Sequence, residues 1–207
     1  LGVVIGDLAS AAETKDVAAQ VNAVGPMDAI IHNAGLYQLP NRDATPEGHA
    51  RTLAVNTLAP FTLTALIKKP SRLIYLSSGL HLGGQGSLDD LDWTQREWDP
   101  LKAYCETKLH VAALAAYLAR SWPDVLSNAV DPGWVPTRMG GPSAPDDLEM
   151  GHQTQVWLAA GNDADAKTSG GYWRHRERQQ PAAEVTDHDF QDQLIAQLSA
   201  LTGVNLP

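Results

Sequence analysis

The sequence contains a single cysteine, Cys105, among its 207 residues. One cysteine excludes a disulfide within the chain, so we expect a protein of a reducing compartment and predict a cytoplasmic location. No apolar run approaches the ~20 residues that a helix needs to cross a bilayer, and no membrane span is predicted. The chain starts at Leu1 rather than at a methionine, so a segment removed ahead of it would leave no trace.

Basic stretches are scarce as well. The net charge is −9, and the one dense basic stretch lies at 174–178, where a solvent-exposed segment is the simplest interpretation. A nucleic-acid-binding protein usually presents a basic face, so we predict no nucleic-acid partner. The seven histidines show no His-x-x-x-His or Cys-His spacing, and we predict no metal site. The absence of Gly-x-Ser-x-Gly excludes a nucleophile elbow.

The chain does contain a regular alternation of strand and helix patterns. Its composition is 43% hydrophobic, which suits one compact domain over residues 1–207. We predict strands at 2–6, 27–32, 72–78, 125–130 and 170–174. We predict helices at 8–25, 45–67, 99–122, 147–160 and about 190–201. Nearly all-apolar strands between helices indicate an α/β fold, with a parallel sheet covered by helices on both faces.

The carboxyl ends of the predicted strands carry small and polar residues. Ligands of open α/β sheets bind beyond these ends. The segments found there are Asp7-Leu8, Asn33-Ala34-Gly35, Ser77-Ser78 and Asp131-Pro132-Gly133. Small residues let a ligand approach the backbone closely, but each segment is also an ordinary turn sequence.

Tyr104 and Lys108 stand four residues apart in the predicted helix 99–122, so they share one helix face. An ammonium beside a phenol lowers the pKa of the phenol, which is ordinarily about 10. The tyrosine could then exchange a proton near neutral pH. Ser78 could hydrogen-bond the same substrate oxygen, and Asn56 is an unusual residue inside an apolar helix. Taken singly, each of these residues also has an ordinary structural explanation.

These motifs, taken together and in their order along the chain, are a more specific signal of function than any one of them. Asp-Leu, Asn-Ala-Gly, Asn, Ser-Ser, Tyr-x-x-x-Lys and Pro-Gly-x-Val-x-Thr follow one another along the chain. This order resembles the short-chain dehydrogenase/reductase family over the whole chain, with a Rossmann-like fold. The insert "GLHLGGQGSLDDLDW" between Ser78 and Tyr104 is similar to the retinol-dehydrogenase-like branch, which hints at a bulky or apolar substrate.

The resemblance implies an NAD(P)-dependent oxidoreductase that interconverts a carbonyl and an alcohol. Tyr104 would be the general acid/base, and Lys108 would lower its pKa and bind the nicotinamide ribose. Ser78 would polarise the substrate oxygen, and Asn56 would anchor a water in the proton relay. The cofactor, NAD or NADP, would also meet Asp7, Leu8, Asn33, Ala34, Gly35, Pro132, Gly133, Val135 and Thr137.

The sequence departs from the family at its start. The family opens with a β-α-β-α unit that carries a glycine-rich turn of the Thr-Gly-x-x-x-Gly-x-Gly type, and this unit is not in the sequence. We therefore expect an incomplete cofactor site in this chain. A non-catalytic binding or structural module is the alternative to an enzyme, and an epimerase or dehydratase is a weaker third. Family members often pair through the helices before and at the Tyr-Lys segment, so a homodimer or homotetramer is expected.

Overall fold

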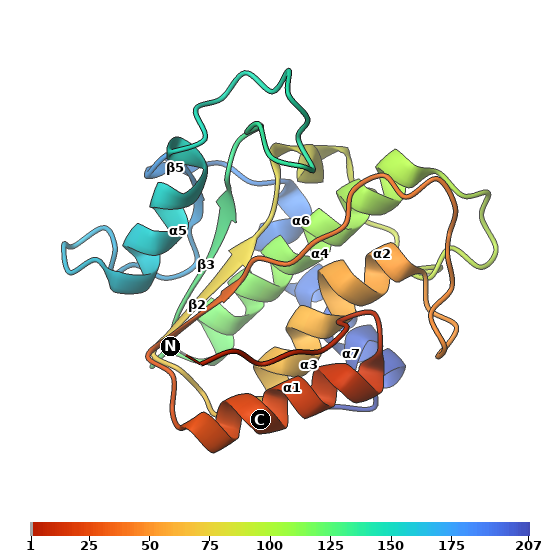
Figure 1. Ribbon diagram of the computed structural model, residues 1–207, viewed down its shortest axis with the longest axis horizontal. Helices are drawn as coiled ribbons and strands as arrows, with labels where there is room; N and C mark the ends of the chain where they lie inside the picture. The colour runs from red at the N-terminus through yellow and green to blue at the C-terminus, as the bar shows by residue number, and fades with distance from the viewer. Residues whose placement is uncertain (1) are drawn as a thin grey trace.

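The computed structural model describes residues 2–207 as a sheet with helices on both faces (Figure 1). Five strands of the described chain form the sheet in the order β1-β2-β3-β4-β5. They span Ala29–His32 (β1), Arg72–Leu76 (β2), Leu126–Asp131 (β3), Tyr172–Arg174 (β4) and Glu177–Gln179 (β5). The first four run parallel, and β5 pairs with β4 in the antiparallel direction. The predicted parallel α/β sheet is therefore confirmed, with an antiparallel edge added.

The longer helices come largely where the sequence places them. They are α1 (Ala11–Val24), α3 (Ala59–Leu66), α4 (Pro100–Ser121), α5 (Met150–Ala160) and α7 (His188–Thr202). The shorter helices are α2 (Arg51–Leu53), the π-helical η1 (Ala54–Leu58), the 3₁₀-helical η2 (Gly79–Gly83) and α6 (Ala183–Thr186).

Capping residues explain where several helices begin. The Ser10 hydroxyl accepts the Glu13 amide at the start of α1. Asp99 accepts two amides at the start of α4, followed by Pro100 in the first turn. Asp187 does the same for α7, which ends at Gly203 with a positive φ of 67°. Each cap satisfies backbone groups that a helix end leaves without partners.

Two elements differ from the sequence-based expectation. Residues 2–6 do not form a strand, and β1 pairs with β2 alone. Val3 and Ile5 lie exposed, so this β-branched run has none of the burial against neighbouring strands that favours a strand. The helix predicted from Thr45 begins at Arg51, because residues 44–50 fold back in an isolated bridge between Ala44 and Ala50.

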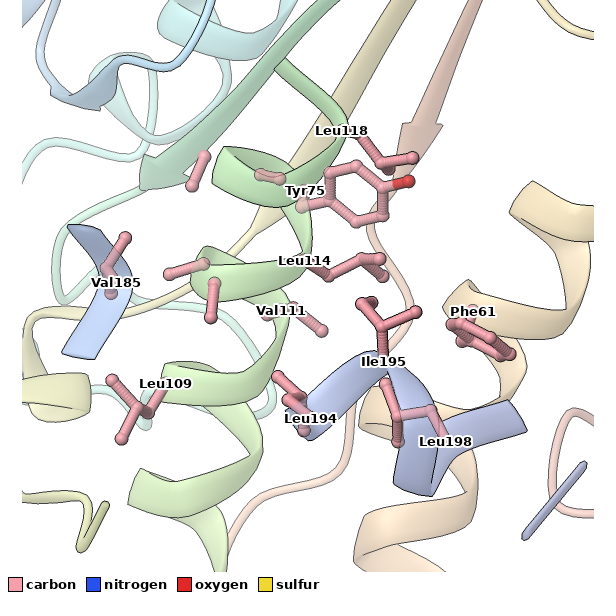
Figure 2. Packing of buried hydrophobic residues seen from close by; sticks show 14 of the residues in the cluster. Phe61, Tyr75, Leu109, Val111, Leu114, Leu118, Val185, Leu194, Ile195 and Leu198 are labelled. Atoms are coloured by element: carbon pink, nitrogen blue, oxygen red, sulfur yellow. The ribbon is translucent and has the colours of Figure 1, made fainter. Parts of the chain in front are cut away.

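Side chains alternate between the two faces of the sheet, and each face has its own core. On one face, Leu73 and Tyr75 of β2 pack with Phe61 of α3, the α4 leucines and α7. Figure 2 shows Leu114 and Leu118 of α4 in this cluster, with Leu194, Ile195 and Leu198 of α7 beside it. On the other face, Ile74 and Val130 pack with Leu158 of α5. This double burial fixes the register of the strands, and with it the edge at which they end.

Candidate active site

Tyr104 and Lys108 lie one turn apart on α4, and both are buried. The Lys108 Nζ donates to the carbonyl of Leu76, the last residue of β2, at 2.8 Å. The Ser77 hydroxyl donates in return to the Lys108 carbonyl at 2.8 Å. These two hydrogen bonds hold the middle of α4 against the carboxyl end of β2.

Ser78 follows directly and meets Tyr104. The Ser78 side chain lies close enough to the Tyr104 phenol to lower its pKa. The Ser78 Oγ also accepts the Leu80 amide at 3.2 Å. The ring of Tyr37 stands edge-on to the ring of Tyr104, with 4.7 Å between centroids. Ser78, Tyr104 and Lys108 thus converge at the carboxyl edge of the sheet, as the motif order predicts.

The electrostatics differ from the expectation. Burial raises the pKa of Tyr104 to about 12, the neighbouring Ser78 side chain acts against this rise, and the nearby Asp131 carboxylate adds to it. Burial lowers the pKa of Lys108 to about 8, because the charged ammonium loses solvation. The net shift of the Tyr104 pKa is therefore upward, and burial outweighs the lowering that the sequence analysis expects from Lys108. The Lys108 Nζ lies 5.6 Å from the Tyr104 ring centroid, and its hydrogen bond goes to Leu76.

Asn56 is buried within the π-helical segment η1, a kind of irregularity that is frequent at functional sites. Its side-chain oxygen accepts the Leu36 amide at 2.7 Å, and its amide donates to the Leu36 carbonyl at 2.9 Å. The same amide donates to the Thr107 hydroxyl on α4 at 3.0 Å. Asn56 therefore ties the chain after β1 to the helix that carries Tyr104 and Lys108.

Gly35 lies in the chain that Asn56 holds. A Cβ at this position would stand 3.4 Å from Lys108 Nζ and 3.5 Å from Asn56 Oδ1. A larger residue would therefore crowd the ammonium. The neighbouring Asn33 and Ala34 are exposed just beyond β1.

The segment after β3 forms the other side of this edge. The Gly133 amide donates to Asp131 Oδ1 at 3.0 Å, and Gly133 has a positive φ of 83°. The Thr137 hydroxyl accepts the Gly140 amide at 3.2 Å. Pro132 and Val135 are half-buried in the same segment, which extends beyond the carboxyl end of β3 in Figure 1.

Asp7 and Leu8 lie apart from this group. The Asp7 carboxylate accepts the Ala9 amide at 2.9 Å and pairs with Arg51 at 3.4 Å. Leu8 packs against the small cluster of Ala18, Leu63 and Ile67. In the described chain, no hydrogen bond joins Asp7 or Leu8 to Ser78, Tyr104 or Lys108.

Two buried residues beside Ser78 escaped the sequence analysis. His81, in the turn after Ser78, is only 1% exposed. Its ring lies 4.4 Å from the ring of Tyr172 in β4. No periodic pattern marks a histidine in a 3₁₀ turn, and Tyr172 comes from a strand almost a hundred positions away. Only the tertiary structure brings the pair to Ser78.

Residues 2–207 contain neither a cluster of metal ligands nor a membrane-spanning helix. No group of three or more His, Cys, Asp or Glu side chains in this range is arranged to hold a metal ion. None of its helices combines the length and apolar composition needed to cross a bilayer.

Comparison with known proteins identifies the family. A family model described as enoyl-(acyl carrier protein) reductase matches residues 2–172. The chain is 40% identical over 210 residues to the short-chain dehydrogenase chry4 of Gibberella zeae, covering 100% of this chain and 80% of that protein. The chain belongs to the short-chain dehydrogenase/reductase family. It is by family an oxidoreductase, as the motifs predict.

More distant relatives agree with this assignment. Human retinol dehydrogenase 13 is 30% identical over 231 residues, covering 97% of this chain and 68% of that protein. A crystal structure of an uncharacterized protein from Mycobacterium paratuberculosis matches with a TM-score of 0.76 at 22% identity, covering 97% of this chain and 75% of that one. NADPH-bound carbonyl reductase from chicken fatty liver matches with a TM-score of 0.59 at 20% identity, covering 87% and 77%. At such identities the structures establish the shared Rossmann-like fold.

Proposed function

We propose that this oxidoreductase interconverts a carbonyl and an alcohol by hydride transfer with NAD or NADP, using Tyr104 as the acid/base. The observation that supports this is the closeness of the Ser78 side chain to the Tyr104 phenol, with the Lys108 ammonium one turn away. Two hydroxyl groups this close together can both reach one substrate oxygen.

The surroundings of Lys108 fit the sugar of a nicotinamide cofactor. An ammonium has three N–H donors, and the Leu76 carbonyl uses one of them. Gly35 leaves open the space in which a side chain would crowd Lys108 Nζ. A ribose offers hydroxyl acceptors for the remaining donors. Asn33, Ala34, Pro132, Gly133, Val135 and Thr137 complete the proposed cofactor site from the same edge, and Asp7 and Leu8 would contribute from its far end.

The protein groups supply the proton in the reduction. When bound, the reduced nicotinamide would supply the hydride for the carbonyl carbon. With a pKa raised to about 12, Tyr104 is a neutral phenol near neutral pH and can donate its proton to the carbonyl oxygen. Ser78 donates a second hydrogen bond to that oxygen. Lys108 stabilises the phenolate left behind, because with a pKa of about 8 it is still largely protonated at neutral pH.

Asn56 would support this step indirectly, by positioning the backbone beside Lys108. Its side chain holds the Leu36 backbone, so it positions the adjacent Gly35 over the Lys108 ammonium. We propose that it also anchors a water through which Lys108 exchanges protons with solvent.

Apolar side chains beside the site suit a carbonyl substrate with apolar substituents. Leu80, Trp134 and Met139 are exposed large hydrophobic residues. The Met139 methyl lies 3.9 Å from the position of a Cβ on Gly35, which places it at the mouth of the site. The names of two relatives, retinol dehydrogenase 13 and carbonyl reductase, are consistent with such substrates.

The experiment is a turnover assay of the native gene product with NADH and NADPH on apolar aldehydes and ketones. Tyr104→Phe should lose nearly all turnover while it stays folded, because the ring keeps its packing and loses only the proton. Tyr117→Phe, the same change at a half-buried position more than three turns further along the same helix, is the matched control. Substantial turnover by Tyr104→Phe would show that another group is the acid. No turnover by the native protein would favour the non-catalytic module.

Self-association and location belong to this proposal as well. We predict a homodimer or homotetramer in the cytoplasm, and sedimentation velocity of the purified protein would measure the first.

A further inference from the structure

The imidazole of His81 is held in one tautomer by its neighbours. Its Nε2 lies 3.1 Å from the backbone amide of Ala182. A backbone amide can only donate, so Nε2 is the acceptor and carries no proton. Burial lowers the pKa of His81, which keeps the ring neutral. The single ring proton is therefore on Nδ1, which donates to the Ser78 carbonyl at 2.8 Å.

Tyr172 directs its hydroxyl to the same carbonyl. The Tyr172 OH donates to the Ser78 carbonyl at 2.8 Å and lies 3.0 Å from His81 Nδ1. Because that nitrogen already carries a proton, the Tyr172 hydroxyl has the carbonyl as its acceptor. The backbone amide of His81 adds a third donor to this oxygen at 2.9 Å. The peptide that follows Ser78 is thus fixed from three directions.

The turn after Ser78 is also held on its outer side. A Cβ on Gly84 would meet the Cys105 carbonyl at 3.1 Å, and one on Gly86 would meet the Glu184 side chain at 2.9 Å. The turn therefore lies between α4 and α6. The His81–Ala182 hydrogen bond joins it to the residue that precedes α6.

We propose that His81 and Tyr172 are positioning residues that aim the Ser78 hydroxyl at the reacting oxygen. This inference rests on the proposed function, in which Ser78 touches the substrate. Fixing the Ser78 carbonyl fixes the backbone from which Oγ projects, and Oγ already accepts the Leu80 amide. Its hydroxyl proton then points toward the site. Through Ala182, the segment before α6 takes part in setting this geometry.

The first test compares kcat, KM and thermal unfolding for variants of the native gene product. Misplacing a reacting group by about 1 Å can cost about 100-fold in rate, so we expect His81→Phe to lose roughly 100-fold and Tyr172→Phe roughly 10-fold in kcat. KM should change less than about threefold. Tyr117→Phe and His188→Asn, at sites without these contacts, are the matched controls and should keep the wild-type kcat.

Two amide variants, each of which replaces one ring nitrogen of His81, separate positioning from a general packing role. His81→Asn places an amide N–H near the position of Nδ1, so it should retain most of the kcat that His81→Phe loses. His81→Gln reaches toward Ala182 and lacks the donor to Ser78, so it should restore thermal stability but not kcat. A kcat that follows the unfolding temperature across both variants would overturn the proposal. If His81→Phe does not fold, Tyr172→Phe decides, because it removes one hydroxyl only.

The second test does not depend on turnover. Nitrogen-15 NMR of the histidine rings of the same protein should show His81 neutral, with its proton on Nδ1. A proton on Nε2 would overturn the proposal. Tyr104→Phe is assayed alongside: if it is active, the proposed function fails. If Tyr104→Phe is inactive while the His81 and Tyr172 variants keep the wild-type kcat, only the positioning role fails.

Discussion

Lys108→Met should make the protein more stable and less active. The ammonium of Lys108 is buried and has no carboxylate partner among the interactions of the described chain. Its pKa falls from 10.5 to about 8 through burial. Since each pKa unit is about 1.4 kcal/mol, the charged form costs the folded state roughly 3 kcal/mol at pH 7.

Methionine has a similar length and carries no charge, so it removes this cost. The variant also loses the hydrogen bond to the Leu76 carbonyl, which contributes about 1 kcal/mol. We therefore expect a net gain of about 2 kcal/mol. For a chain of this size, that corresponds to a rise of about 4–8 °C in the unfolding temperature. Turnover should be nearly lost, because the phenolate of Tyr104 would have no cation beside it.

The pH dependence gives a sharper check. The folded-state pKa of Lys108 lies below its unfolded value, so the penalty is fully present below about pH 8. It disappears as the pH rises toward 10.5, because the lysine is then neutral in both states. The stability advantage of Lys108→Met should shrink over this range.

The assay is thermal and chemical unfolding of both proteins at pH 7 and pH 10. Lys102→Met, which removes a more exposed lysine from the same helix, is the matched control and should change stability by less than about 0.5 kcal/mol. A Lys108→Met variant less stable than the native protein at pH 7, or an advantage that persists unchanged at pH 10, would refute the reasoning.

Three further predictions concern other parts of the molecule. Glu106→Gln should lower the free energy of unfolding, measured by chemical denaturation, by about 3 kcal/mol. The reason is that buried Glu106 pairs with Arg96 at 2.8 Å and accepts the Trp93 indole N–H at 3.0 Å. Glu97→Gln, at an exposed position, is the control. Asp99→Ala should cost about 1 kcal/mol by the same measurement, because it removes the cap of α4. A polypeptide of these 207 residues should bind NADH and NADPH weakly in calorimetric titration, since its sequence has no glycine-rich turn for the pyrophosphate; a low-micromolar dissociation constant would contradict this.

Local patterns in the sequence were sufficient for most of the elements. Capping residues such as Ser10 and Asp99 mark helix starts, because they satisfy amides within the same turn. Apolar runs mark β2 and β3, since strands buried on both faces need apolar residues throughout. The run at 2–6 has the same local pattern and forms no strand, because a strand depends on a partner as well as on its own residues.

The candidate site, too, combines features that the sequence predicts with features that only the structure shows. The order of the motifs was enough to select Ser78, Tyr104 and Lys108, because the ends of parallel strands and the helix beside them meet at one edge. Their protonation states depend on burial, which no short stretch of sequence reveals: it raises the pKa of Tyr104 and lowers that of Lys108. The contacts of His81 and Tyr172 with Ser78 join positions far apart in the chain. The sequence by itself therefore determined the family and the candidate groups, and the tertiary structure decided how those groups are charged and aimed.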